Sequence, residues 1–348
     1  CLSESPARYR LMVEETHIQL KLKEIRELAK KVFLANTCST EMAEVLADVI
    51  MLCERDGPAS HGLFSMYSYV GSLRNGISNG KANPVAEYPK PGVIRVDGDN
   101  GYNQLVINQF TPELVNAARE TGIATLAIRN SHHIGPLRQD LEPIAKAGLV
   151  AFSCVVSKAL MTSYKGNKKL FGTDPIAFAC PRKGKEPVVW DMSTSSMSFM
   201  EIEVASTKNE QIQPDSAVDK YGNPTLDSVA AMDGGMLLPF AKHKGSAIAF
   251  MVELMAAGLT GGRFAFENST PDDPYFAGAN RGQTIIVMDP DIIHGPGFVD
   301  RVSEFLDAYL ESTPERVPGD GRLERRQKAI LDGVRVDREL LKTVQSFL

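Results

Sequence analysis

The sequence of 348 residues lacks several common signatures of nucleotide-binding and metal-dependent enzymes. It has no GxGxxG motif opening a βαβ unit, no GxxxxGK[ST] phosphate loop and no HExxH motif. These absences argue against an ordinary Rossmann fold, a P-loop NTPase and a zinc protease. Histidine occurs six times, so imidazole chemistry depends on few positions.

Charge and cysteine content exclude further classes. The formal net charge is −5, so neither nucleic acid nor an anionic membrane surface is expected as a partner. No uncharged stretch is long enough to span a membrane, and no signal peptide precedes the first helical segment. The five cysteines include no CxxC pair, and Cys154 and Cys180 lie in apolar runs typical of buried free thiols. We therefore expect a cytoplasmic protein.

The hydrophobic pattern predicts an α/β protein with a mixed central sheet. Short apolar runs separated by turns predict strands, and longer segments with helical spacing surround them. The strand-rich part, residues 121–229, is predicted to be one domain. Residues 1–120 together with 230–348 are predicted to form a helical lobe from both chain ends. The apolar segment 246–262 is predicted to be a core helix, and the polar stretch 206–228 a surface loop or hairpin.

Two adjacent histidines, His132 and His133, follow the apolar run IATLAIR. Neighbouring side chains on a strand point to opposite faces, so the pair cannot grip one metal ion, and no metal is expected. One of the two is predicted to pack in the core. The other precedes Gly135, where backbone N–H groups can open toward a ligand.

Two further segments are candidates for chemistry. His61 follows Ser60 at an apparent helix start, and its pKa range suits proton donation near neutral pH. A capped helix with a half-exposed histidine explains the same residues. Lys242, His243 and Lys244 precede an apolar helix, where cations and free N–H groups form an anion site. A solvated basic turn is the alternative there.

Taken together, these segments resemble the malate/L-lactate dehydrogenase type 2 family, and within it the Δ1-piperideine-2-carboxylate/Δ1-pyrroline-2-carboxylate reductases. The resemblance covers residues from about 20 to 340, and the matching motifs occur in the family's order: SHG at 60–62, NSHH at 130–133, LFGTDPIAFACP at 170–181, WDMSTS at 190–195 and GGMLLPFAKHKGSA at 234–247.

The resemblance implies a homodimeric NAD(P)-dependent oxidoreductase with a non-Rossmann nucleotide-binding fold like that of L-sulfolactate dehydrogenase. It assigns Ser60, His61 and an acid to a proton relay, and His133 as proton acceptor in some relatives. Substrate-binding positions are Ser65 and Thr173. The positions that match cofactor contacts are His133, Ile134, Gly135, Pro136, Leu137, Thr173, Asp191, Met192, Ser193, His243, Lys244, Gly319 and Arg322.

The sequence departs from the reductase pattern at two positions. The relay acid is Glu201 instead of aspartate, one methylene longer. Ser65 stands where the reductases carry an arginine that holds the substrate carboxylate, so another cation such as Arg74 or Arg138 serves, or the substrate differs.

We expect hydride transfer from NAD(P)H, with NADPH favoured over NADH, to C2 of a cyclic imine-2-carboxylate or a 2-oxo acid. The alternatives are a malate-, L-lactate- or ureidoglycolate-type 2-hydroxy acid dehydrogenase, and a catalytically lapsed homologue that binds nucleotide.

Overall fold

The computed structural model describes residues 16–268 and 281–348, which belong to two compact units. The terminal unit comprises Cys1–Lys81 and Gly319–Leu348, and the sheet unit comprises Ala82–Pro318. Both chain ends belong to one unit, whose limits differ from those of the predicted lobe of residues 1–120 and 230–348. Strands near residues 85–102 and 281–288 belong to the sheet unit, because they pair with strands remote in sequence. Local periodicity does not reveal such pairing.

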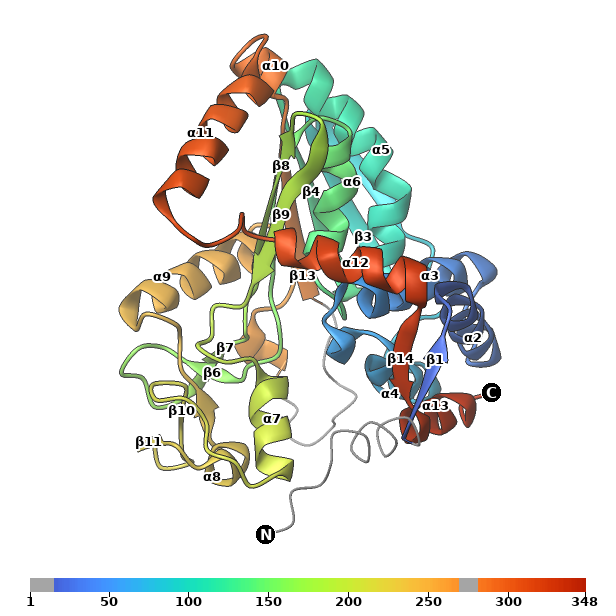
Figure 1. Cartoon of the computed structure of the whole chain (residues 1–348), viewed down its shortest axis with the longest axis vertical. Coiled ribbons are helices and arrows are strands. Elements are labelled where there is room, and N and C mark those ends of the chain that lie inside the picture. Colours follow the sequence, from blue (N-terminus) through green and yellow to red (C-terminus); the bar gives the residue numbers. More distant parts are fainter. Residues whose placement is uncertain (1–15, 269–280) are drawn as a thin grey trace. The chain divides into compact units, whose positions relative to one another are not determined.

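A seven-stranded mixed sheet organises the sheet unit (Figure 1). Its order is β2-β3-β4-β13-β5-β8-β9, with β3 parallel and β13 antiparallel to β4. The strands are β2 (Val85–Lys90), β3 (Val93–Tyr102), β4 (Ile123–His132), β13 (Arg281–Met288), β5 (Val150–Val155), β8 (Ile176–Arg182) and β9 (Lys185–Met192).

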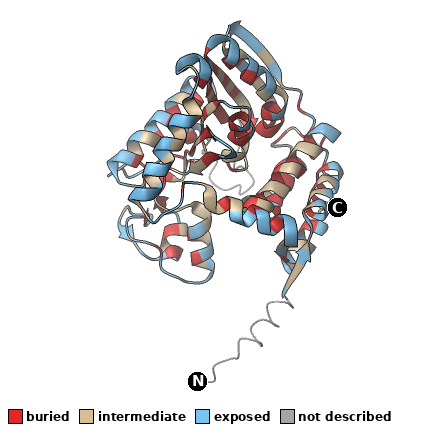
Figure 2. Cartoon of the chain, turned by 45° about the horizontal axis from the view of Figure 1, so that its top comes forward, coloured by how far each residue is buried: buried red, intermediate tan, exposed pale blue. Residues whose placement is uncertain are grey.

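Helices cover the sheet and create its core. Figure 1 shows α5 (Asn103–Thr121) and α6 (Arg138–Lys146) beside the strands, and Figure 2 shows buried residues concentrated on the sheet and the inward helix faces. Leu126, Ile285 and Leu141 are fully buried in this layer. Lys146 binds Glu142 and also Glu186, 2.9 and 3.0 Å away, and thereby ties α6 to β9.

A smaller five-stranded sheet of order β11-β10-β12-β6-β7 completes the strands of this unit. Within the polar stretch 206–228, β10 and β11 form the predicted hairpin. The elements are β6 (Met161–Thr162), β7 (Lys169–Phe171), β10 (Ala217–Val218), β11 (Pro224–Thr225), β12 (Met236–Leu237), α7 (Phe199–Thr207), α8 (Ser228–Met232), α10 (Pro290–Ile293), α11 (Phe298–Ser312) and the 3-10 turn η4 (Ala265–Asn268).

In the structure, the segment 246–262 is not a single buried helix as predicted. It consists of α9 (His243–Val252) and a π-helical segment, η3 (Glu253–Gly258). One face packs on the sheet unit's core through Val252 and Ala256. Phe250 and Leu254 are exposed on another face, 58% and 50% respectively, so the segment is only half buried. High mean hydropathy alone does not distinguish burial within one chain from an apolar surface.

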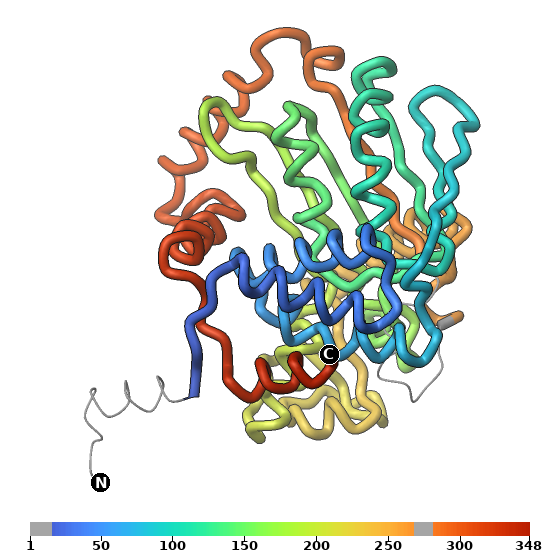
Figure 3. Tube along the Cα trace, turned by 90° about the vertical axis from the view of Figure 1, so that its right-hand side faces the viewer, coloured from blue at the N-terminus to red at the C-terminus, as the bar shows by residue number. Residues whose placement is uncertain are grey.

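The terminal unit joins the two chain ends through a two-stranded sheet. β1 pairs antiparallel with β14, and α12 packs against α3, as the blue and red segments of Figure 3 show. Ser39 caps α3 as its hydroxyl accepts from Met42 N, and Gly57 with φ of 77° ends the helix. The elements are β1 (His17–Leu20), α2 (Leu22–Ala35), α3 (Thr40–Asp56), 3-10 turns η1 (Ala59–His61) and η2 (Leu63–Ser65), α4 (Met66–Arg74), α12 (Asp320–Asp332), β14 (Val334–Asp337) and α13 (Arg338–Gln345).

The described cysteines are free thiols and buried: Cys38, Cys53, Cys154 and Cys180. Burial raises the pKa of Cys38 and Cys154 to about 12. In the described ranges, no helix is long and apolar enough to cross a membrane.

Candidate active site

His132 and His133 occupy different environments. His132, the last residue of β4, is 2% exposed, and its Nε2 lies 2.9 Å from Asn100 Oδ1. Its ring is tilted against Tyr102. His132 is therefore the histidine that packs in the core, as predicted for one member of the pair. Among the described residues, no group of three or more His, Cys, Asp or Glu side chains is arranged to hold a metal ion.

His133 faces a carboxylate that the sequence reading missed. Its Nε2 lies 3.8 Å from Asp140 Oδ2, and both side chains are more than nine-tenths buried. Asp140 Oδ2 also accepts a 2.9 Å hydrogen bond from Gln283 Nε2, and Gln283 in turn accepts from Asn103. A carboxylate near an imidazole orients the ring and stabilises its cation. This gives His133 surroundings suited to proton transfer.

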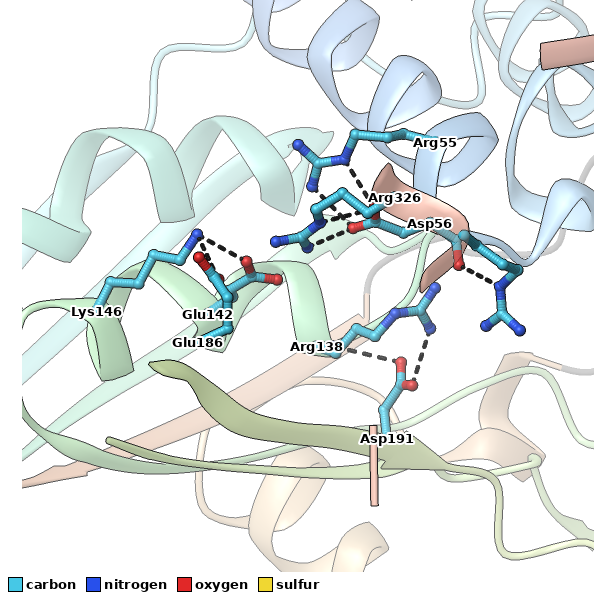
Figure 4. Close-up of polar contacts among 9 residues, drawn as sticks. Arg55, Asp56, Arg138, Glu142, Lys146, Glu186, Asp191 and Arg326 are labelled. Atoms are coloured by element: carbon cyan, nitrogen blue, oxygen red, sulfur yellow. Dashed lines mark hydrogen bonds and ion pairs between the residues drawn. The ribbon is translucent and has the colours of Figure 1, made fainter. Parts of the chain in front are cut away.

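The loop from His133 to Leu137 is fixed at both ends. The Ile134 carbonyl accepts from Gln104 Nε2 at 2.6 Å, and Gly135 adopts a φ of 148°, which favours glycine. After the loop, the Arg138 guanidinium donates to Asp191 Oδ1 at 2.9 Å (Figure 4). Asp191 is the penultimate residue of β9, so this ion pair joins the loop to the predicted Asp191–Met192–Ser193 segment.

Thr173 sits in a turn held by hydroxyl groups. Its N–H donates to Ser157 Oγ at 2.6 Å, and the two hydroxyl oxygens lie 3.0 Å apart. Its carbonyl accepts from both the N–H and the hydroxyl of Thr194. Thr194 follows Ser193 directly, and the Thr194 carbonyl accepts from Phe240 N. The chain of bonds therefore links Thr173 to the predicted segments at 191–193 and, through Phe240, to the start of α9.

The start of α9 carries exposed basic residues. His243 and Lys244 are its first two residues and both are exposed, while Lys242 before them lies 3.8 Å from Asp215. The His243 ring lies beside that of Tyr164, whose N–H donates to Ser246 Oγ. Such basic residues suit a diphosphate, and the hydroxyls and glycine loop nearby suit the polar parts of a dinucleotide. The donor set of the sheet unit thus fits a nicotinamide cofactor.

Ser60 and His61 lie in the terminal unit, on η1. Ser60 Oγ is 3.1 Å from His61 Nδ1, and both residues are half-buried. The segment after them is held by Glu54, whose carboxylate accepts from Leu63 N at 2.7 Å. Burial raises the pKa of Glu54. Ser60 and His61 are thus in contact, their relay with an acid stays a prediction, and Glu54 is a supporting residue that the sequence did not indicate.

The Ser65 side chain binds backbone carbonyls in this structure. Its side chain is buried, and its hydroxyl donates to the carbonyls of His61 and Gly62, 3.0 and 2.8 Å away. With its proton used there, Ser65 has none to offer a substrate carboxylate. The two alternative cations are engaged as well: Arg138 by Asp191, and Arg74 by Asn36 and the Phe347 carbonyl.

Glu201 is exposed at the first turn of α7. Its Oε2 accepts from Ser198 N and from the Ser198 hydroxyl, both at 2.8 Å, in a capping box. Glu201 belongs to the sheet unit and His61 to the terminal unit. Their pairing in a relay stays a prediction.

Gly319 and Arg322 lie at the start of α12 in the terminal unit. Gly319 is left-handed with a φ of 92°, and Arg322 is buried. One turn later, Arg326 binds Asp56 through two hydrogen bonds, and Arg55 binds the same carboxylate (Figure 4). Burial acts to raise the pKa of Asp56, but hydrogen bonds from Arg55 and Arg326 outweigh it and lower the pKa to about 2.

Known proteins resemble this chain over nearly its whole length. The family model described as malate/L-lactate dehydrogenase matches residues 20–345. The chain belongs to the malate/L-lactate dehydrogenase family. As a member of this family, the chain is an oxidoreductase. Membership also explains why a nucleotide-binding fold is expected although the sequence has no Rossmann glycine motif.

Relatives of this family member span nearly its whole length. A Δ1-pyrroline-2-carboxylate/Δ1-piperideine-2-carboxylate reductase of Pseudomonas syringae pv. tomato is 40% identical, over 92% of this chain and 93% of the relative. A (2R)-3-sulfolactate dehydrogenase (NADP+) of Chromohalobacter salexigens is 35% identical over 87% and 90%. The crystal structure of Δ1-piperideine-2-carboxylate reductase from Pseudomonas syringae superposes with a TM-score of 0.92, at 38% identity, over 95% of this chain and all of that one.

Proposed function

We propose that this chain is an NAD(P)H-dependent reductase of a cyclic imine-2-carboxylate, Δ1-piperideine-2-carboxylate or Δ1-pyrroline-2-carboxylate, or of a 2-oxo acid. The observation that carries the proposal is His133, held against Asp140 beside a loop that Asp191 fixes through Arg138. Bound NAD(P)H would supply the hydride for C2 of the substrate. The names of the reductase relatives support the substrate class.

The chain's own residues would bind, orient and protonate. In the sheet unit, the loop 133–137 and the 191–193 segment would hold the cofactor, with His243 and Lys244 beside its phosphates. We favour NADPH over NADH because the exposed Lys165, Lys168 and Lys169 can meet a 2′-phosphate and a related dehydrogenase is named for NADP+. His61, in contact with Ser60, or His133, in contact with Asp140, would donate a proton to the developing alkoxide of a keto acid. For a protonated imine these groups would orient the substrate instead.

One observation weakens the assignment as a reductase without selecting the second candidate, a 2-hydroxy acid dehydrogenase. The relay segment carries Ser65 where the reductases carry arginine, and the Ser65 hydroxyl is used by backbone carbonyls. The substrate carboxylate would then be held by neutral donors such as Thr173. Neutral donors hold a carboxylate less firmly than an arginine fork does.

The deciding experiment follows NADPH and NADH oxidation at 340 nm on Δ1-piperideine-2-carboxylate, Δ1-pyrroline-2-carboxylate, pyruvate and oxaloacetate. Fast turnover of the cyclic imines supports the reductase. Turnover of the open-chain acids alone supports the dehydrogenase, and nucleotide binding without turnover on any substrate supports a lapsed homologue. His61→Ala should reduce kcat by about a hundredfold or more while cofactor affinity changes little. An equal loss of both would contradict its role as proton donor.

We also propose a cytoplasmic homodimer. The resemblance to homodimeric enzymes suggests it, and the apolar face of α9 and η3 offers a surface for a second copy of the chain. Phe250, Leu254 and Leu259 are the most exposed members of this face, at 58%, 50% and 68%.

A further inference from the structure

Three charged residues of the sheet unit are buried together, and no step of the proposed reaction uses them. Asp174, Glu253 and Arg281 are 0%, 6% and 2% exposed. They come from the turn after β7, the start of η3 and the start of β13. Each interacts electrostatically with the other two. Burying charge costs free energy unless the charges are paired, so the cluster needs an explanation.

The backbone is irregular at each of the three positions. Asp174 has a φ of 36°, which residues other than glycine rarely adopt. Glu253 begins the π-helical segment η3, and the pairing of β13 with β4 shifts register just after Arg281. Irregularities of these kinds persist where the surrounding structure requires them and often mark functional regions. Here all three irregularities meet at one buried cluster.

The charges balance if the two carboxyls hold one proton. Burial, followed by repulsion from the Glu253 carboxylate, raises the pKa of Asp174 well above its usual range, and burial raises the pKa of Glu253 to about 7. Arg281 remains a cation, although burial lowers its pKa to about 10. Cys154 on β5 also faces Asp174, and burial keeps this thiol protonated. A protonated Asp174, an ionised Glu253 and a cationic Arg281 give no net charge.

Hydrogen bonds connect this cluster to Thr173. Asp174 Oδ1 accepts from Ser157 N at 3.1 Å, and the Ser157 hydroxyl accepts from Thr173 N. The Asp174 and Glu253 side chains also interact directly, and within the described ranges Asp174 Oδ2 has no other hydrogen-bond partner, so the proton shared by the two carboxyls is placed on Asp174 Oδ2. The Glu253 carboxylate accepts from Gly172 N and from Ala265 N. Asp174 and Glu253 therefore hold the turn 172–174 from both sides.

We propose that Asp174 and Glu253, buried together with Arg281, are positioning residues that fix the Ser157–Thr173 turn and so place Thr173 toward substrate and cofactor. The inference rests on the proposed role of Thr173 in binding. Neither carboxyl is assigned a contact with the reacting atoms.

The proton-sharing state predicts different effects for two substitutions at one position. Asp174→Asn imitates a protonated carboxyl: its oxygen still accepts from Ser157 N, and its amide can donate to Glu253. This variant should keep kcat/KM within about threefold of the parent. Asp174→Ala removes both interactions and should lower kcat/KM by about tenfold to a hundredfold, because small displacements of a binding group are costly. Asp300→Asn, which removes an exposed carboxylate bound to Lys183, is the matched control.

A double-mutant cycle with Thr173→Ala separates positioning from general loss of structure. If Asp174 acts through Thr173, adding Asp174→Ala to Thr173→Ala should cost little further activity at a temperature where both variants are folded. An undiminished tenfold cost in the Thr173→Ala background would overturn the inference. So would a loss in Asp174→Asn equal to that in Asp174→Ala, a comparison that still decides if the alanine variant is poorly folded.

Hydrogen exchange distinguishes failure of this inference from failure of the proposed function. The peptide containing Gly172 and Thr173 should exchange faster in Asp174→Ala than in the parent, and at the parental rate in Asp174→Asn and Asp300→Asn. If the parent turns over none of the substrates, the proposed function fails while this exchange pattern still tests the turn. Unchanged exchange in Asp174→Ala would overturn the positioning role whatever the activity.

Discussion

The Glu201 carboxylate accepts hydrogen bonds from both the backbone N–H and the hydroxyl of Ser198. The predicted relay acid is thus also the residue that closes the first turn of α7. A single carboxylate oxygen, Oε2, accepts both bonds, which leaves Oε1 for another partner. The capping box holds the longer glutamate side chain in one orientation, so a glutamate in place of aspartate is compatible with a relay.

Variants of these two residues separate capping from catalysis. Ser198→Ala should destabilise the protein by about 1 kcal/mol through loss of the cap, with kcat nearly unchanged. Glu201→Ala should lose similar stability and, if Glu201 is the acid of the predicted relay with His61, should in addition lower kcat at least about tenfold. Thermal melts and steady-state kinetics on both variants provide the measurement. Equal kcat in the two variants would show that Glu201 only caps the helix.

Asp140 offers a second test of imidazole chemistry. Asp140→Asn keeps the size of the side chain and its place beside Gln283, but it removes the negative charge 3.8 Å from His133. If His133 transfers the proton, kcat should fall about tenfold to a hundredfold, with the cofactor Kd nearly constant. Kinetics and NADPH fluorescence titration check this. Asp300→Asn serves as control, since it removes an exposed carboxylate that pairs with Lys183.

The sequence predicted many of the strands and helices, because each of them depends mainly on the local pattern of apolar and polar residues. The apolar run IATLAIR before the two histidines lies in the strand β4, and the polar stretch 206–228 contains a hairpin, as expected. The order of strands in the sheet could not be predicted from local patterns. β13 lies between β4 and β5, and the paired residues are more than 120 positions apart in the sequence. No local periodicity reports such contacts, which is why the predicted domain limits included β13 in the helical lobe.

For the candidate site, the residue types and the order of the motifs predicted which residues belong to it. They did not predict which side chains these residues contact. The sequence predicted His133 as a site residue. It did not predict Asp140, because an aspartate in the helical segment α6 looks like any other polar residue of a helix. Ser65 was predicted as a substrate-binding position. In the structure its hydroxyl donates to backbone carbonyls in the 3-10 turn η2, a local geometry that the sequence did not indicate. Turn geometry of this kind depends on neighbours such as Glu54, which binds Leu63 N from α3.

Ser65 should therefore behave as a structural residue. Ser65→Ala removes the donor to two backbone carbonyls and should cost about 1 kcal/mol of folding stability. KM for the substrate should stay within about twofold, because the hydroxyl proton is already used. A large rise in KM without a change in melting temperature would restore Ser65 as a substrate contact.

Asp56 should control stability at acid pH. Its pKa is about 2 in the folded protein, below the ordinary value of 3.8, because the ion pairs with Arg55 and Arg326 outweigh burial. The stabilisation is present above the ordinary pKa and is lost as pH falls from 3.8 toward about 2. Asp56→Asn should unfold more easily at neutral pH by about 3 kcal/mol and show less further loss over that acid range. Denaturant unfolding across pH tests this, and parallel pH profiles for the two proteins would contradict it.

The apolar face of α9 and η3 should decide the oligomeric state. Phe250 and Leu254 lie four residues apart and are at least half exposed, while Val252 and Ala256 pack in the core. Replacing both exposed residues by glutamate places charge on the proposed interface, where unpaired charge is costly. The variant should elute as a monomer in size-exclusion chromatography with light scattering, whereas the parent should be a dimer. Phe305→Glu on α11, where Phe305 is 67% exposed, is the control and should remain dimeric. A dimer that survives the double substitution but dissociates with Phe305→Glu would move the interface to α11.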